Sequence, residues 1–239
     1  MTVSDKMFQL EGRWLMGKVI PHKMLEGIGK HLTLVAPGRE DEVVAAIAAR
    51  AEDLVAANQD MVEDGPSKGM LAMSSVVLAG YEILRPELDD DGARAILFLE
   101  HIINESLSRS MEVVFGALAS RKNPLDKVDA AIRKSTAMYG SYFHFEFERP
   151  DPEDFEMRIT RCFFRDFFAR HDALIVTTVL CSLDAAWMQA LDPAVSGLRA
   201  ERSSLLSLGG TSCSFRVVGT DDPLAAYSDV ITTRFTPAG

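Results

Sequence analysis

The spacing of the apolar residues changes near Tyr139, and this change constrains the fold more than any other feature of the chain. Before it, apolar residues recur every three or four positions, as they do along one face of a helix. After it, Phe143, Phe145 and Phe147 alternate with polar or charged residues at the period of a half-buried strand. The chain is therefore predicted to be helical at first and to mix helices with strands afterwards.

The first part predicts four helices after residues 7–34, which fit helix and irregular structure equally well. Acidic residues from Glu40 to Glu42 open a helix that reaches about Val62 and is broken by Gly65-Pro66-Ser67. A second helix is expected from about Lys68 to Leu84. The third has the longest apolar stripe, made of Ile96, Leu99, Ile103, Leu107, Met111, Val114 and Leu118. A shorter helix follows Asn123-Pro124, with Leu125, Val128 and Ile132 on one face.

Two hairpins are predicted in the second part. The first pairs residues 143–147 with residues 155–160 across a turn at 150–152, and the second pairs residues 198–206 with residues 211–218. Between them, helices are expected at 163–170 and 175–191. We therefore expect an α+β fold with an N-terminal helical layer packed on a four-stranded antiparallel sheet of two hairpins. Residues 1–136 would be the helical region, 137–219 the α+β region and 220–239 a loosely held tail, in one integrated unit.

Composition excludes several classes of protein. A chain of 239 residues that is 47% hydrophobic can bury a large core, and 25 Lys and Arg against 35 Asp and Glu give a net charge of −10, which disfavours nucleic-acid binding. The uncharged runs Gly69–Tyr81 and Ala173–Leu183 are shorter than the roughly 20 apolar residues of a membrane helix. The N-terminus has no secretory signal pattern, so a cytoplasmic location is the default expectation.

The cysteines supply the first candidates for chemistry. Their odd number and wide spacing argue against a disulfide framework. Cys181 and Asp184 are three residues apart on the helix expected at 175–191, so a thiol and a carboxylate would project together. A partly buried Asp184 would orient a cationic substrate, position water or act as a general base. The alternative is an exposed, solvated Asp184 beside a cysteine that only flanks the core.

The remaining candidates each have a structural alternative. Cys162 lies between a strand and a helix, where free N–H groups and the nearby Arg161 and Arg165 favour a nucleophilic thiolate, although a small residue also suits a tight junction. Cys213 is on the apolar face of its strand and would only pack unless that face lines a cavity. His144, on a polar strand face, is a candidate substrate contact or a surface residue. Zinc binding by the three cysteines and Asp184 is an alternative, but no CxxC pair supplies two ligands from one turn, so no metal is predicted. No glycine-rich loop lies at a helix N-terminus, so no other cofactor is predicted.

Several short motifs lie in the order found in one family. They are Arg161-Cys162, Cys181-Ser182-Leu183-Asp184, Arg202-Ser203-Ser204-Leu205, and Gly209 with Cys213-Ser214-Phe215. Over residues 155–218 the chain resembles the L-2-amino-thiazoline-4-carboxylic acid hydrolase family, in which aspartate usually stands at the position of Ser214. The resemblance implies hydrolytic opening of a C–N bond in a thiazoline or cyclic amidine. On this pattern we expect Cys162, Cys181, Asp184 and Cys213 to converge on one pocket. Cys181 is the preferred catalytic nucleophile and Cys162 the second choice, Asp184 is the catalytic carboxylate, and Cys213 and Arg202 are expected to contact the substrate.

Two other functions remain open. Helices followed by two hairpins also look like the ligand-binding domain of the 4-vinyl reductase group and of trafficking-complex subunits, so a small-molecule-binding protein without catalysis is the main alternative. A scaffold whose helices only mediate assembly is the other. A small molecule is the expected partner of either the hydrolase or the binding protein. The helices between Val43 and Leu118 present more apolar surface than one sheet covers, which favours a homodimer.

Overall fold

The computed structural model describes residue 10 and residues 12–235, which form an α+β protein of two compact units. Unit 1 comprises the described part of Met1–Ser106 together with Ala137–Tyr142 and Phe163–Leu180. Unit 2 comprises Leu107–Thr136, Phe143–Cys162 and the described residues from Cys181 onward. The chain passes between the units several times, so each unit joins segments that are distant in the sequence.

The elements follow the predicted order. The helices are α2 (Ile20–Leu32), α3 (Glu40–Ala57), α4 (Gly65–Glu87), α5 (Gly92–Ala119), α6 (Pro124–Ser135), α7 (Phe163–Arg170), α8 (Thr177–Cys181), α9 (Asp184–Gln189) and α10 (Pro193–Ser196). The strands are β1 (His144–Glu148), β2 (Asp154–Arg161), β3 (Leu198–Ser204), β4 (Cys213–Gly219) and β5 (Ser228–Asp229). A π-helical turn spans Leu15–Val19, and short 3-10 turns span Gln59–Met61, Thr136–Tyr139, Leu174–Val176, Leu206–Leu208 and Val230–Thr233.

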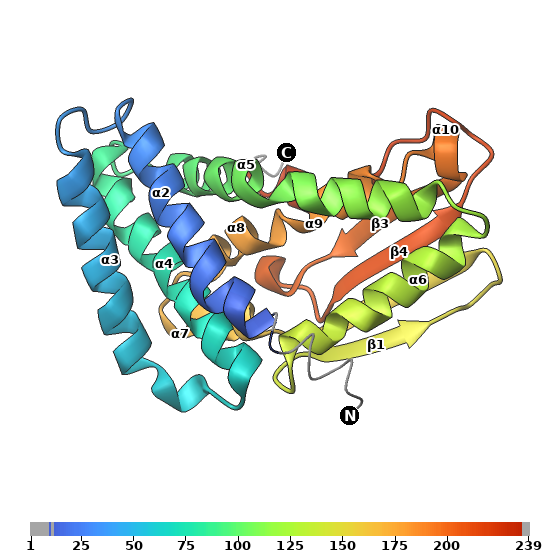
Figure 1. The fold of residues 1–239 in the computed structure, drawn as a ribbon, viewed down its shortest axis with the longest axis horizontal. Coiled ribbons are helices and arrows are strands. Elements are labelled where there is room, and N and C mark those ends of the chain that lie inside the picture. The colour runs from blue at the N-terminus through green and yellow to red at the C-terminus, as the bar shows by residue number, and fades with distance from the viewer. Residues whose placement is uncertain (1–9, 11, 236–239) are drawn as a thin grey trace. The chain divides into compact units, whose positions relative to one another are not determined.

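The helix α4 is the central element of unit 1, where it packs against α2, α3 and α7 (Figure 1). It begins three residues before the predicted start, because the Asp64 side chain accepts a hydrogen bond from the N–H of Ser67 at 2.7 Å while the Ser67 hydroxyl accepts from the N–H of Asp64. This reciprocal cap satisfies N–H groups that the first helical turn leaves unpaired. Gly65 and Pro66 thus belong to the first turn of α4, although they still separate it from α3.

Unit 2 contains a five-stranded mixed sheet in the order β1-β2-β4-β3-β5. Both predicted hairpins are present and antiparallel, with Phe147 opposite Met157 in the first and Arg202 opposite Phe215 in the second. The prediction of a four-stranded, wholly antiparallel sheet was wrong in one respect: β5 pairs in parallel with β3. This strand is only two residues long, too short to produce an alternating pattern.

Helical residues of unit 2 pack with the sheet in a single core. Buried side chains from α6, the end of α5 and α9 join those of β2, β3 and β4, among them Val128, Trp187 and Phe215. The predicted stripe of α5 holds at Ile96, Leu99 and Ile103, which are buried, but Val114 is 55% exposed. The helix belongs to unit 1 up to Ser106 and to unit 2 from Leu107, so its second half packs on a different core. In its second half Phe115 instead packs on Trp187, with ring centroids 5.7 Å apart.

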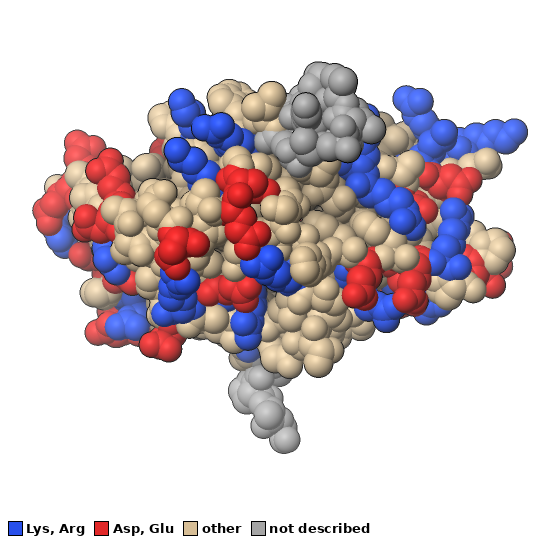
Figure 2. Space-filling view, turned by 90° about the horizontal axis from the view of Figure 1, so that it is seen from below, with Lys and Arg blue, Asp and Glu red and all other residues tan. Residues whose placement is uncertain are grey.

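Charged side chains of both signs are interspersed on the face that Figure 2 shows. Several of them form ion pairs within one unit, including Arg50 with Glu82 at 2.7 Å in unit 1 and Arg149 with Asp126 at 2.8 Å in unit 2. Such pairs on a solvated surface contribute little stability, typically about 0–1 kcal/mol each. Among the described helices, none has an uncharged apolar stretch sufficient to cross a bilayer.

Candidate functional site

The helix predicted at 175–191 is interrupted at the point where Cys181 and Asp184 lie. The helix α8 ends at Cys181 and α9 begins at Asp184. In a continuous helix the carbonyl of Cys181 would accept the N–H of Ala185, but that N–H bonds the carbonyl of Ser182 instead. The Cys181 oxygen accepts a hydrogen bond from Nη1 of Arg202 at 2.8 Å. The hydrogen bond from Arg202 therefore replaces the missing helical hydrogen bond and stabilises the break between α8 and α9.

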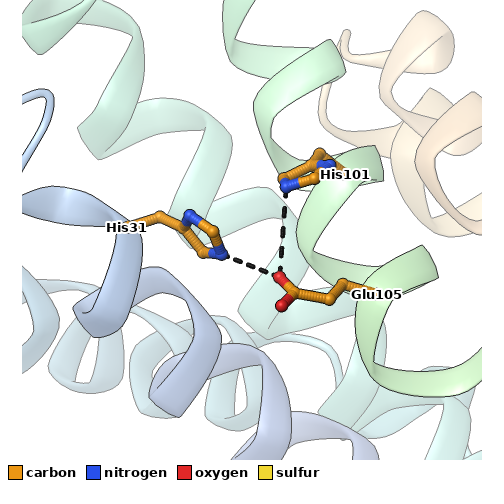
Figure 3. A group of neighbouring side chains, drawn as sticks. All are labelled: His31, His101 and Glu105. Carbon is orange, nitrogen blue, oxygen red and sulfur yellow. Dashed lines mark hydrogen bonds and ion pairs between the residues drawn. The ribbon is translucent and has the colours of Figure 1, made fainter.

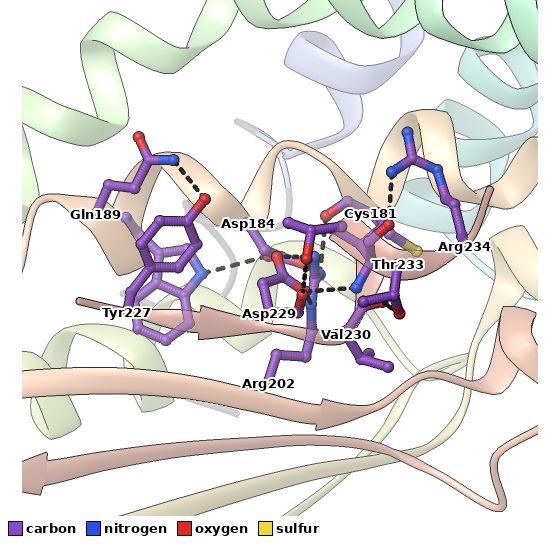
Figure 4. Close-up of polar contacts among 12 residues, drawn as sticks. Cys181, Asp184, Gln189, Arg202, Tyr227, Asp229, Val230, Thr233 and Arg234 are labelled. Atoms are coloured by element: carbon purple, nitrogen blue, oxygen red, sulfur yellow. Dashed lines mark hydrogen bonds and ion pairs between the residues drawn. The ribbon is translucent and has the colours of Figure 1, made fainter. Parts of the chain in front are cut away.

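Arg202 lies between two carboxylates (Figure 4). Its Nη1 donates to Oδ2 of Asp184 at 3.0 Å, while its Nε and Nη2 donate to the two carboxylate oxygens of Asp229 at 2.8 and 2.6 Å. The side chains of Arg202 and Asp229 are fully buried, whereas that of Asp184 is 34% exposed. A buried guanidinium requires such partners, because an uncompensated charge inside a protein is costly. Asp184 is thus the member of the cluster that a solute can reach.

The sheet and α9 hold this arginine in place. Arg202 and Phe215 are opposite each other on β3 and β4, and the guanidinium lies 5.4 Å from the centre of the Phe215 ring. Trp187 of α9 packs on the same ring at 5.9 Å and donates its indole N–H to Oδ1 of Asp184 at 3.3 Å. Stacking and hydrogen bonding together fix the Asp184 carboxylate. Burial raises the pKa of Asp184, and the charge of Arg202 opposes that rise.

Two cysteines adjoin the ion pairs. The Sγ atom of Cys181 lies 4.0 Å from the hydroxyl of Ser207, and the Sγ atom of Cys213 accepts the N–H of Leu206 at 3.4 Å. Burial raises the pKa of the Cys181 thiol to about 12 and that of the Cys213 thiol to about 11. Each thiol also interacts electrostatically with Arg202 and Asp184. Both cysteines therefore rest as neutral thiols near neutral pH.

The sequence candidates do not all occupy this cluster. Cys181, Asp184, Arg202 and Cys213 lie together in unit 2. Cys162 is buried directly after the end of β2, three residues beyond the Ile159 that pairs with Cys213.

His144 is exposed at the start of β1 and pairs with Arg161 of β2. In the sheet order β2 and β4 separate β1 from the strand that holds Arg202. The structure does not bring His144 to the cluster.

Two members of the cluster were missed by sequence reasoning. Asp229 lies in the segment 220–239 expected to be a loose tail, yet it is buried and its carboxylate also accepts the N–H of Ile231 at 3.0 Å. Ser207 lies between the strands of the second hairpin and is also buried. An open hollow of about 550 Å³ adjoins the cluster; its lining residues are Arg202, Ser203, Tyr227, Ser228, Asp229, Val230, Thr232 and Thr233.

A second group of reactive side chains was also missed. In unit 1, His31, His101 and Glu105 place one metal-ligating atom each within 4.8 Å of one another. The only sequence signal for it is the spacing of His101 and Glu105, which are one helical turn apart. His31 comes from another helix, so the group cannot be recognised from local spacing.

Comparison with known proteins agrees with the motifs around the first cluster. The chain matches no curated protein and no solved structure. A family model described as L-2-amino-thiazoline-4-carboxylic acid hydrolase matches residues 70–217, which is more than half of the chain. The matched range includes Cys181, Asp184, Arg202 and Cys213 but ends before Asp229. The chain therefore belongs to the L-2-amino-thiazoline-4-carboxylic acid hydrolase family.

Proposed function

We propose that this protein is a hydrolase that opens a C–N bond in a small thiazoline or cyclic amidine, with Cys181 and Asp184 as its principal catalytic residues. The family membership supports a hydrolase. One structural observation carries the assignment of residues: the break between α8 and α9 puts a thiol and a partly exposed carboxylate beside one buried arginine. The combination offers a nucleophile and an anion to a cationic substrate.

Asp184 is suited to bind a protonated amidine. Its carboxylate already accepts bonds from Arg202 and Trp187, but a third of the side chain stays exposed and can accept an N–H of the substrate. A carboxylate favours the charged form of a neighbouring base. Asp184 would therefore bind the amidinium and favour the protonated form, in which the ring carbon is more electrophilic.

The neutral thiol of Cys181 fits this reaction if the substrate removes its proton. The substrate would enter as the neutral amidine, and the S–H proton of Cys181 would then pass to its basic ring nitrogen. This transfer leaves a thiolate beside an amidinium that Asp184 stabilises. The sulfur then forms a bond to the amidine carbon. The ring C–N bond breaks with its electron pair going to the ring nitrogen, which takes a second proton from the other amidine nitrogen and becomes an amine. Water attacks the same carbon, and the C–S bond breaks to release the product and restore the thiol.

The other candidate residues have supporting roles in this proposal. Arg202 positions Asp184 and the carbonyl of Cys181, and the thiol of Cys213 borders the substrate. Cys162 is the second choice as nucleophile. His144 stays a candidate substrate contact only if a larger substrate extends toward β1.

One observation favours the alternative of a small-molecule-binding protein without catalysis. Burial raises the pKa of both cluster thiols well above neutral pH. A protonated cysteine behaves as a small apolar side chain, so two such thiols also suit a binding surface that carries out no reaction. In that case Cys181→Ala would leave ligand affinity unchanged, and there would be no turnover to lose.

The test is a turnover assay with 2-aminothiazoline-4-carboxylate and related cyclic amidines. Wild type is compared with Cys181→Ala, Cys162→Ala, Asp184→Asn and the matched control Cys213→Ala, a thiol in the same cluster with no covalent role. We expect Cys181→Ala to abolish turnover and Asp184→Asn to lower it about 100-fold or more, while Cys213→Ala keeps most of it.

Mass spectrometry of a quenched reaction should also detect a covalent adduct on Cys181. Full activity in both Cys181→Ala and Cys162→Ala would eliminate thiol catalysis. Ligand binding by wild type without turnover of any heterocycle would favour the binding protein instead.

A further inference from the structure

Three metal-ligating side chains meet on unit 1, and none of them belongs to the proposed hydrolase site (Figure 3). His31 lies in the last turn of α2, and His101 and Glu105 lie on α5. The Nε2 atom of His31 is 2.8 Å from Oε2 of Glu105, and the Nε2 atom of His101 is 3.9 Å from the same oxygen. Both imidazoles therefore converge on one carboxylate oxygen.

A close approach of the two helices sets up this arrangement. One turn before His31, a Cβ atom added to Gly27 would lie 2.6 Å from Cγ2 of Ile102. Nonbonded carbon atoms prefer separations of about 3.5–4.0 Å, so only glycine permits this approach. His31 is thereby placed opposite His101, and their ring centroids are 5.2 Å apart at an interplanar angle of 79°.

We propose that His31, His101 and Glu105 bind one divalent transition-metal ion of the zinc class. Two imidazoles and a carboxylate are a ligand set that Zn²⁺ accepts, whereas Mg²⁺ and Ca²⁺ prefer oxygen ligands alone. With metal–ligand bonds of about 2.1 Å, ligand atoms of a tetrahedral site are about 3.4 Å apart. The observed separations of 2.8 and 3.9 Å lie on either side of that value.

The site is open to solvent on one side. The side chain of His31 is 20% exposed, that of Glu105 45% and that of His101 64%. His101 is the most exposed of the three, so its ring has room to move toward a bound ion. Three protein ligands leave at least one position for water, as in catalytic rather than structural zinc sites. The bound metal would link α2 to α5 and carry an exchangeable water.

Lys30 determines how the proposal is tested, because its Nζ atom binds Oε1 of Glu105 at 2.8 Å. Oε1 is not the oxygen that the two histidines face. The alternative to a metal site is an ion-pair network in which Lys30 and the two histidines surround Glu105. In the proposed site, Lys30 holds the second carboxylate oxygen from outside, as hydrogen-bond partners of metal-ligating carboxylates do. Its 67% exposed side chain can also move into water.

The experiment uses the full chain, stripped of metal with a chelator and titrated with Zn²⁺ by calorimetry and with Co²⁺ by visible absorption. We expect one equivalent of Zn²⁺ to bind and Mg²⁺ not to compete. His31→Ala, His101→Ala and Glu105→Gln should each weaken Zn²⁺ binding by at least about tenfold, since loss of even an outer partner typically costs 10–100-fold. His22→Ala, an exposed histidine on the same helix, should bind as wild type does. Lys30→Met removes only an outer partner of Glu105 and should weaken Zn²⁺ binding less than any of the three ligand variants.

A melting experiment guards against variants that misfold. Zn²⁺ should raise the melting temperature of wild type, His22→Ala and Lys30→Met, and should raise that of Glu105→Gln by less at the same Zn²⁺ concentration, because stabilisation by a ligand falls as its affinity falls. No binding by wild type would overturn the proposal. Equal loss in Lys30→Met and the three ligand variants, or thiolate charge-transfer bands in the Co²⁺ spectrum, would overturn it as well, the latter by locating the metal on cysteine.

Discussion

The guanidinium of Arg202 donates a hydrogen bond to the carbonyl oxygen of Cys181 at 2.8 Å, across 21 residues of sequence. That bond replaces the helical bond which the same oxygen would otherwise accept from Ala185. It fixes the backbone at the break between α8 and α9, and the same guanidinium holds the carboxylate of Asp184. The orientation of the thiol relative to the carboxylate therefore depends on a residue of the sheet.

The stability of unit 2 should depend strongly on Arg202. Replacing it with methionine leaves the fully buried carboxylate of Asp229 without its cation, and we expect the free energy of unfolding to fall by about 3–5 kcal/mol. Adding Asp229→Asn should recover part of this loss, because an asparagine is uncharged and still accepts the N–H of Ile231. Urea unfolding followed by circular dichroism measures both variants.

The matched control for this prediction is Arg216→Met on the neighbouring strand. Arg216 pairs with Asp154, but its side chain is 45% exposed, so its removal should lower the free energy of unfolding by no more than about 1 kcal/mol. Losses that simply add in the double variant of Arg202 and Asp229 would show that the buried pair is not coupled.

The buried thiols predict an alkaline loss of stability. The folded pKa values of Cys181 and Cys213, about 12 and about 11, lie above the ordinary value of 9.0. Above pH 9 the unfolded chain releases thiol protons that the folded chain retains, so the free energy of unfolding contributed by these groups falls as the pH rises toward 11. Below pH 9 their contribution is constant. The fall should be shallower in Cys181→Ala/Cys213→Ala, and an unchanged slope would contradict the assigned direction.

The turn that follows α6 should be sensitive at Gly140. This residue has φ +67°, and an added Cβ would overlap the carboxylate of Asp64, which caps α4 and also binds the N–H of Ser141 at 2.7 Å. Gly140→Ala should lower the free energy of unfolding by about 2 kcal/mol or more, from backbone strain and displacement of that carboxylate. Gly38→Ala, with φ +81° and open space around it, should show only the strain, about 1 kcal/mol. Thermal unfolding of both variants decides whether the overlap matters.

Much of the fold was predictable because its signals are local. Alternation at Phe143, Phe145 and Phe147 identified β1, and apolar stripes with helix-breaking residues between them identified α3 to α6. The helix at 175–191 was predicted as continuous because its apolar spacing does continue. Its break is stabilised by Arg202, a residue of β3 that lies 21 positions from Cys181 in the sequence, so local spacing does not indicate it.

The candidate site was predictable for residues that match a family motif and not for the others. Cys181, Asp184, Arg202 and Cys213 belong to short motifs and do lie together. Asp229 follows the matched range and has no apolar periodicity around it, so nothing local distinguishes it from a solvated aspartate. Its burial follows from a partner 27 residues away.

The last prediction separates the two carboxylates that share Arg202. Asp184→Asn should keep the fold, because Asp229 still accepts two hydrogen bonds from the guanidinium and the side chain of Asp184 is 34% exposed. We expect a loss of about 1 kcal/mol or less in the free energy of unfolding, together with a fall in turnover of about 100-fold or more. Asp229→Asn should show the reverse order, with the larger loss in stability, since it removes the only fully buried anion beside Arg202 among the described residues. Urea unfolding and steady-state kinetics on both variants test this contrast, and equal losses of turnover and stability in the two would show that Asp184, like Asp229, only supports the arginine.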